Sequence, residues 1–328
     1  MNQERNDQNQ GALSLRANAW RQLRRNPIAM VCLWIVIIFG LVACYGEIVY
    51  WRYHITDAQP PRLLVPVQQL FKKILLVDSV AGKEAPYQRQ NLDDEYKPPS
   101  WTHPMGTDSL GRDVCQRVIQ GARIAFWVGM ITSLIAIPIG VILGCLGGYF
   151  GGKVDDFVVW LYTTFACMPS LLFVMAIAMV VGKGKLTGIY LGIGLTAWVG
   201  LCRLIRGEVM KHKERQYVQA ARALGVGNFS IMFRHILPNI FHIVIITFSL
   251  RFPAAIATEV FLSFLGIGVQ GEPSWGLMIG SARLRLWYGV WWELGFTTLA
   301  IFVIILAFNL LGDALRDALD PRLRTTEG

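Results

Sequence analysis

The sequence has few charged residues for its length. They occupy 16% of the 328 positions, whereas soluble chains have about 25%. Hydrophobic residues make up 54%, and the mean hydropathy is +0.43. This composition predicts a membrane protein. The net charge of +9 would suit a nucleic-acid-binding protein, but the basic residues lie in short segments between apolar runs, so no nucleic-acid partner is expected.

Several motifs of enzymes and processed proteins are also missing. The sequence has no GxxxxGK[ST] phosphate loop, and 182–185 is no substitute because Leu186 follows its last lysine. It has no Ser/His/Asp or paired-carboxylate arrangement, and its six cysteines and five histidines lack metal-ligand spacing. The first apolar run is too long for a cleavable signal. We therefore expect no enzyme, no metal site and no nucleotide site in this chain.

What the sequence does contain is a series of apolar runs, each near the roughly 20 residues that a transmembrane helix needs. Open strands cannot satisfy their backbone groups in lipid, so each run predicts a helix. The expected spans are 28–50, 124–146, 157–181, 186–205, 240–265 and 291–311. The predicted fold class is therefore all-α, a polytopic membrane protein with six transmembrane helices.

The basic residues predict the orientation of these spans. Lys and Arg gather before the first span, between the fourth and fifth spans, and after the last span, and six spans place all three segments on one side. Basic loops face the cytoplasm. The expected organisation is a cytoplasmic tail at 1–27, a span at 28–50, an extracytoplasmic segment at 51–123, a core at 124–311 with a cytoplasmic loop at 206–239, and a cytoplasmic tail at 312–328.

The extracytoplasmic segment contains Cys115 and has two parts. Residues 57–99 are rich in Pro, Gln and Asp, which predicts a loop with little helix. Residues 109–113, Ser-Leu-Gly-Arg-Asp, are typical of a capped short helix before the second span.

The loop between the fourth and fifth spans is longer than a connection of about 2–8 residues needs to be. It predicts two amphipathic stretches, with Gly225 and Gly227 breaking the helix, Asn228 capping the second stretch and Pro238 ending it. The apolar faces comprise Tyr217, Ala221 and Leu224, then Phe229, Met232, Phe233 and Ile236. Such a loop is either a docking element for a soluble partner or a hairpin on the membrane surface.

This loop resembles the EAA loop of ABC importer permeases, in which Glu-Ala-Ala precedes a glycine and then Ile-Leu-Pro. The matching residues are Ala220, Ala221, Gly225, Ile236, Leu237 and Pro238. Gln219 stands where the family usually has Glu, which argues against an ion pair from this position to the ATPase but still allows a hydrogen bond. The resemblance implies that these residues, with Tyr217 and Leu224 as apolar anchors, couple the chain to an ATPase.

Four further segments extend the resemblance to the dipeptide/oligopeptide/nickel subfamily, and within it to the second, C-type permease. They are 103–123, 148–156, 261–276 and 308–324. The chain departs from the subfamily in its longer 57–99 segment and in Ala314, where Gly is common. The resemblance implies a type I ABC importer permease fold in a bacterial inner membrane. It also implies a homologous second permease, two ATPase subunits that bind ATP and Mg²⁺, and an extracytoplasmic solute-binding protein.

Three features of the core allow more than one interpretation. Gly140, Gly144, Gly148 and Gly152 predict close helix packing, either beside a transport path or within the fold alone. Arg251 and Glu259 lie roughly 80° apart on the fifth span, so they are candidates for the translocation path together with Ser263. Alternatively, Glu259 forms a buried structural pair with Arg251 or with a polar group on the other permease. Residues 266–288 form a short helix facing the binding protein, or an exposed turn.

The expected function is a permease that moves small peptides by alternating access. The same machinery importing nickel or another small solute is the alternative. An ion-coupled secondary transporter would have several carboxylates within its spans and inverted repeats, whereas Glu259 is the only clear candidate inside a span and the sequence shows no repeat. A non-transporting scaffold or a membrane peptidase would not need the long docking loop.

Overall fold

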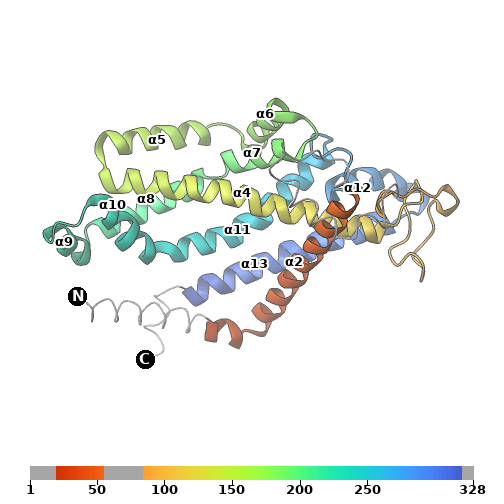
Figure 1. Ribbon diagram of the computed structural model, residues 1–328, viewed down its shortest axis with the longest axis horizontal. Helices are drawn as coiled ribbons and strands as arrows, with labels where there is room; N and C mark the ends of the chain where they lie inside the picture. The colour runs from red at the N-terminus through yellow and green to blue at the C-terminus, as the bar shows by residue number, and fades with distance from the viewer. Residues whose placement is uncertain (1–19, 55–83, 320–328) are drawn as a thin grey trace, which may run out of the picture.

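The computed structural model describes residues 20–54 and 84–319, and most of these residues are helical (Figure 1). The long elements are α2 (Pro27–His54), α4 (Val114–Phe150), α11 (Leu237–Phe264) and α13 (Trp292–Leu319). The shorter helices are α5 (Gly152–Ala166), α6 (Ser170–Gly182), α7 (Leu186–Thr196), α8 (Val199–Lys213), α9 (Gln216–Ala223), α10 (Asn228–Ser230) and α12 (Trp275–Ala282). Three irregular helical segments complete the list: η3 (Leu92–Asp94), η4 (Ile231–Ile236) and η5 (Arg283–Tyr288).

Five helical segments of the described chain are long and apolar enough to cross a membrane, and a bent pair makes a sixth if it counts as one span. The five are Pro27–His54, Val114–Phe150, Leu186–Lys213, Asn228–Phe264 and Trp292–Leu319. The all-α, multi-span fold class is confirmed. The expected 57–99 loop falls partly outside the described residues, and its described part contains only the single turn of η3.

The third predicted span is not a single straight helix but the bent pair α5 and α6. The run 157–181 was expected to be one helix, but α5 and α6 meet at an angle of 89°. Pro169 lies at the break, immediately before the first residue of α6. Proline has no N–H for the helix and clashes with the carbonyl four residues earlier, so α5 cannot continue through it.

Helix α4 begins earlier than the predicted second span. Asp113 is its N-cap, and the Asp113 carboxylate accepts a hydrogen bond of 3.0 Å from the backbone N–H of Gln116. The expected separate helix at 109–113 does not form. Those residues instead make the turn that leads into α4, because Asp108 accepts backbone N–H bonds from Leu110 and Arg112 at 2.9 and 3.0 Å.

Pro238 does not end the second amphipathic stretch, which is a second correction. The π-helical segment η4 runs directly into α11, and the segment from Asn228 to Phe264 is one helical unit of 37 residues. A wider π turn accommodates a residue that cannot make the regular α-helical hydrogen bond. The second amphipathic stretch and the fifth span are therefore one continuous helical body of about 55 Å.

The glycines of α4 allow it to pack closely against α8. A Cβ atom on Gly144 would lie 2.8 Å from the carbonyl oxygen of Cys202, and one on Gly148 would lie 2.7 Å from that of Arg206. Gly140 meets Trp198 and Leu201 in the same way, whereas Gly152 faces open space. Three of the four predicted glycines thus form a helix–helix contact within this chain.

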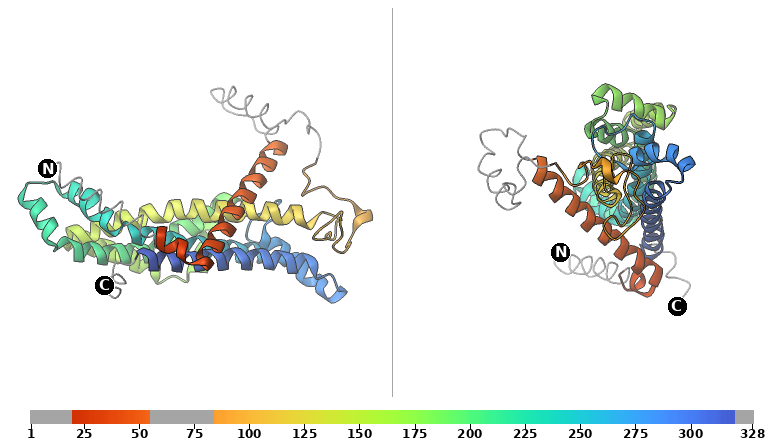
Figure 2. Two further views of the ribbon diagram at one scale, coloured as in Figure 1. Left: turned by 90° about the horizontal axis from the view of Figure 1, so that it is seen from below. Right: turned by 90° about the vertical axis from the view of Figure 1, so that its right-hand side faces the viewer.

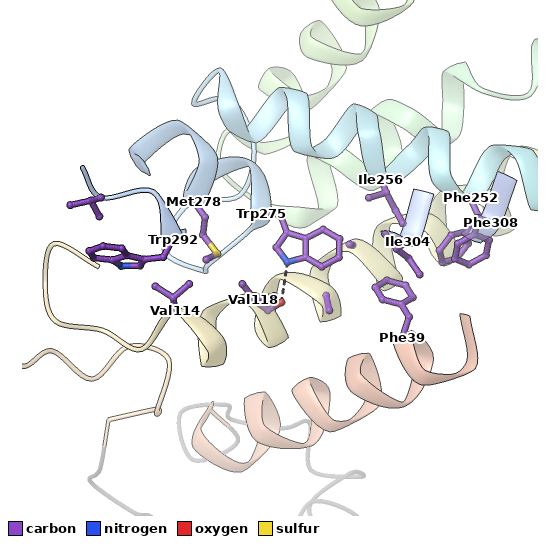
Figure 3. Packing of buried hydrophobic residues seen from close by; sticks show 13 residues of the cluster. Phe39, Val114, Val118, Phe252, Ile256, Trp275, Met278, Trp292, Ile304 and Phe308 are labelled. Atoms are coloured by element: carbon purple, nitrogen blue, oxygen red, sulfur yellow. Dashed lines mark hydrogen bonds between the residues drawn. The ribbon is translucent and has the colours of Figure 1, made fainter. Parts of the chain in front are cut away.

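The main apolar core joins α2, α4, α11, α12 and α13. Phe252 and Phe308 stack with ring centroids 4.4 Å apart, and Phe39 of α2 packs edge-on against Phe308 (Figure 3). Trp275 of α12 lies in the same cluster and donates a 3.0 Å hydrogen bond to the carbonyl of Val118 (Figure 3). Helix α2 crosses the other long helices obliquely (Figure 2).

Candidate functional site

Helix α9 and the turn after it form one end of the molecule, opposite the end that carries α12 (Figure 1). The turn has the two hydrogen bonds of a Schellman motif: Gly225 N–H to Arg222 O at 2.9 Å, and Val226 N–H to Ala221 O at 3.1 Å. Gly225 has φ = +76°, the left-handed conformation that this motif requires. The predicted break at 225–227 is present, and it has a defined backbone cause.

The two faces of α9 have different surroundings. Val218 and Ala221 are buried in an apolar cluster with residues of α4, α8 and η4. On the other face Gln219 and Ala220 are exposed, and Leu224 has 83% of its surface exposed. Ala221 therefore anchors α9 to its own chain, whereas the other face is available to another subunit.

The second amphipathic stretch divides in the same way. Met232 and Ile236 are fully buried, whereas Phe229 and Phe233 are exposed to 62% and 38%. Asn228 does not cap this stretch, because Gly227 is the N-cap. The Asn228 side chain instead accepts a 3.0 Å hydrogen bond from the hydroxyl of Tyr149 in α4.

Polar contacts hold α9 and its neighbours to the helical bundle. The Tyr217 hydroxyl and His212 Nδ1 are 2.8 Å apart, and burial raises the pKa of Tyr217. Arg206 of α8 forms a two-pronged ion pair with Asp155 of α5, with Nη2 2.6 Å from Oδ2. The exposed surface of α9 is thus carried by a braced element rather than by a loose loop.

Arg251 lies near the middle of α11 and lines a cavity of about 160 Å³ between α4, α6, α7 and α11. It is the one ionisable residue in the lining, which otherwise contains hydroxyl-bearing and apolar side chains. No carboxylate of the described residues pairs with Arg251, and its Nε is buried without a hydrogen-bond partner. The cavity is the candidate solute-contacting site of this chain.

Glu259 and Ser263 lie on the part of α11 that packs against α12, outside the cavity lining. The Ser263 hydroxyl donates a 2.7 Å hydrogen bond to Glu259, and Glu259 has only 1% of its surface exposed. Glu259 and Arg251 form no ion pair, so the pairing considered from sequence does not occur within this chain. A transport role for Glu259 and Ser263 stays a prediction.

Charged networks connect the segments at the α12 end. Arg123 of α4 pairs with Glu272, which follows α11, and lies 3.4 Å from Glu47 of α2. Arg285 of η5 lies 2.8 Å from the buried Glu293 of α13 and donates a 2.7 Å hydrogen bond to Ser109. Residues 266–288 include a short helix, α12, and they are tied into the bundle.

The sequence singled out Arg251 as a candidate, but it gave no indication of the other residues that line the cavity. Thr132 and Ser133 come from α4, whereas Ser170 and Leu171 come from the first turn of α6. Isolated hydroxyls in an apolar helix carry no distinctive pattern. Pro169-Ser170 was the available signal, because a proline inside an apolar run predicts a new helix start.

The geometry defines a class: an all-helical, multi-span membrane protein in which a tight turn joins an exposed helix, α9, to a cavity-lining span. Comparison with known proteins defines the family. Residues 136–325 match the binding-protein-dependent transport system inner membrane component, and residues 14–66 match the N-terminal transmembrane domain of oligopeptide transport permease C. The chain belongs to this family of ABC transporter permeases, whose members are membrane subunits and not the catalytic ones.

Two of the relatives are similar over nearly the whole chain, and a third over about three quarters of it. The dipeptide transport system permease protein DppC of Bacillus subtilis is 36% identical over 99% of this chain and 92% of its own. The oligopeptide permease OppC of the same organism is 35% identical over 95% and 92%. The glutathione permease GsiD of Pectobacterium atrosepticum is 36% identical over 73% and 80%. The resemblance to C-type permeases is confirmed, as is the multi-pass membrane location.

Proposed function

We propose that this chain forms half of the pathway by which a bacterial ABC importer moves di- and oligopeptides across the inner membrane. A homologous permease would supply the other half, two ATPase subunits would bind ATP and Mg²⁺, and an extracytoplasmic protein would deliver the solute. The names of the relatives support the peptide class. Both chain termini and α9 would lie in the cytoplasm, and the α12 end would face the binding protein.

One observation carries the coupling mechanism. The exposed face of α9 is joined through a Schellman turn to a continuous helical body that reaches Arg251. A movement of an ATPase against α9 would therefore be transmitted along η4 and α11 to the cavity without crossing a flexible loop. Such rigid-body motion is the simplest way to alternate access between the two sides.

The test is reconstitution of the complete importer from its own gene cluster in proteoliposomes. We expect ATP hydrolysis to rise when peptide-loaded binding protein is added, and labelled dipeptide to accumulate inside. A nickel salt is compared in parallel. Uptake of Ni²⁺ without uptake of peptides would contradict the proposed solute, and peptide uptake without any ATPase subunit would contradict the proposed class of importer.

A further inference from the structure

The cavity beside Arg251 combines several positive or hydrogen-bond-donating groups with no negative one. Arg251 brings a guanidinium group, and its Nε has no partner. Ser133 has 3% of its surface exposed, and its hydroxyl also has no hydrogen-bond partner. A buried donor without a partner is destabilising, because it has lost its hydrogen bonds to water and gained none in return. Two such groups in one cavity indicate a binding site for a group that accepts hydrogen bonds.

The broken span adds a third donor to the same cavity. The first residues of α6, Ser170 and Leu171, line the cavity, and no side chain caps this helix. The first N–H groups of a helix have no acceptor within the helix and carry a partial positive charge. The 89° bend between α5 and α6 places this helix start at the edge of the cavity, where Ser170 and Leu171 line it and are also exposed at the surface. Half-helices of this kind are a recurrent means of binding anionic solutes within membranes.

The size of the cavity suits a small anionic group. A single water needs roughly 10–15 Å³, whereas the cavity measures about 160 Å³. The remaining lining consists of threonine hydroxyls and small apolar side chains, among them Thr132, Ala136 and Ala255. A carboxylate accepts several hydrogen bonds at once and pairs with a guanidinium group in a two-pronged geometry.

We propose that this cavity is a subsite for a carboxylate group of the passing peptide, held by Arg251, Ser133 and the N-terminus of α6. The inference rests on the proposed function, because it assigns a part of the solute to one place on the pathway. The carboxylate is either the C-terminus of the peptide or an acidic side chain, since both present the same chemistry.

The experiment uses the complete importer in proteoliposomes and compares uptake of Ala-Ala with that of Ala-Ala-amide. The ratio of the two uptake rates is measured for the wild type and for Arg251→Gln. The same binding protein serves every measurement, so its own preference cancels when the ratios are compared. We expect Arg251→Gln to lower uptake of Ala-Ala by roughly tenfold and to leave the amide nearly unchanged, because a charge-assisted hydrogen bond is lost.

Two further variants and one control complete the test. Arg251→Lys keeps the positive charge but loses the two-pronged geometry of the guanidinium group, and Ser133→Ala removes one hydrogen-bond donor. Each variant should lower the uptake of Ala-Ala more than that of Ala-Ala-amide, and by a smaller factor than Arg251→Gln. Arg203→Gln removes an exposed arginine of α8 outside the cavity and should not change the ratio. Copurification of the ATPase subunits shows whether each variant assembles. If Arg251→Gln does not assemble, the uptake ratios of Arg251→Lys and Ser133→Ala test the proposal.

The outcomes separate the two proposals. Equal losses for acid and amide, or an unchanged ratio in all assembled variants, would overturn the carboxylate subsite and leave the peptide importer intact. Failure of the wild type to move any peptide would overturn both. Asp-Ala-amide identifies the source: a fall with Arg251→Gln means that side-chain carboxylates are also bound, and no fall assigns the cavity to the C-terminus.

Discussion

Gly225 determines how α9 ends. Its φ of +76° is costly for residues with a Cβ, by about 1–2 kcal/mol. A Cβ there would meet no atom within 4 Å, so the cost lies in the backbone alone. We expect Gly225→Val to insert and assemble, to transport less, and to lose the response of ATP hydrolysis to loaded binding protein. Gly225→Asn should keep more activity because Asn tolerates this conformation. Normal coupling in Gly225→Val would contradict the role of the turn.

Ala220 and Ala221 are adjacent in sequence, but one is exposed and the other is buried. Substitutions at the two positions therefore distinguish loss of ATPase docking from loss of α9 packing. Ala221 is 6% exposed within the cluster that holds α9, whereas Ala220 is exposed. Ala221→Glu should detach α9 by burying a charge without a partner, which limited proteolysis of the permease would detect. Ala220→Glu should leave α9 protected yet reduce copurification of the ATPase. Identical behaviour of the two variants would mean that α9 has no distinct docking face.

Glu259 is a buried carboxylate, and the sequence alone does not determine its role. Ser263 donates to it, and Ser274, the N-cap of α12, also hydrogen-bonds it. Glutamine offers one acceptor oxygen instead of two, so one serine loses its acceptor. We expect Glu259→Gln to lower the stability of the permease by roughly 1–3 kcal/mol and to lower transport. Thermal unfolding in detergent and peptide uptake are the measurements. Wild-type values for both would remove Glu259 from the candidate site.

At the scale of the element, the α4–α8 contact depends on the absence of side chains on α4. A Cβ on Gly144 would lie 2.8 Å from a backbone oxygen and 2.9 Å from Ile205 Cβ, and neither atom can move away without a shift of the α8 backbone. Gly144→Leu should force the helices apart and cost about 1–3 kcal/mol or more. Gly207→Leu is the matched control, because a Cβ there meets no atom within 4 Å. Equal melting temperatures for the two variants would contradict this packing.

The sequence predicted which segments are helical but not how they join. Apolar length located the six runs because a bilayer demands it. It could not predict that α5 turns by 89° at Pro169 while η4 passes directly into Pro238. Both sites contain a proline, and which one breaks the helix depends on whether the neighbouring helices leave room for a widened turn. The cavity was missed for the same reason, since the bend brings Ser170 to Arg251.

At the scale of the whole molecule, the two ends differ in how they are held. The α9 end presents an exposed helix on an apolar cluster, whereas the α12 end is bound by ion pairs that link α2, α4, α13 and the segment after α11. An exposed helix at one end and an ion-paired surface at the other would suit an ATPase on one side and a solute-binding protein on the other. The Arg251 cavity lies between them on α11.

The proposed orientation of the chain in the membrane can be tested with a cysteine introduced at each of two surface positions. Trp101 is fully exposed and belongs to the segment before α4, which lies at the end of the molecule opposite α9 (Figure 1). Lys211 is in the last turn of α8, just before α9, and its side chain is 68% exposed. The native Cys44 and Cys167 are exposed and are first replaced by alanine, together with Cys115. A membrane-impermeant maleimide should label Trp101→Cys in intact cells and label Lys211→Cys only after permeabilisation, because a charged reagent cannot cross the bilayer. Retained peptide uptake shows that each variant is folded. The reverse labelling pattern would place α9 outside the cell, where no ATPase could reach it, and would contradict the proposed coupling.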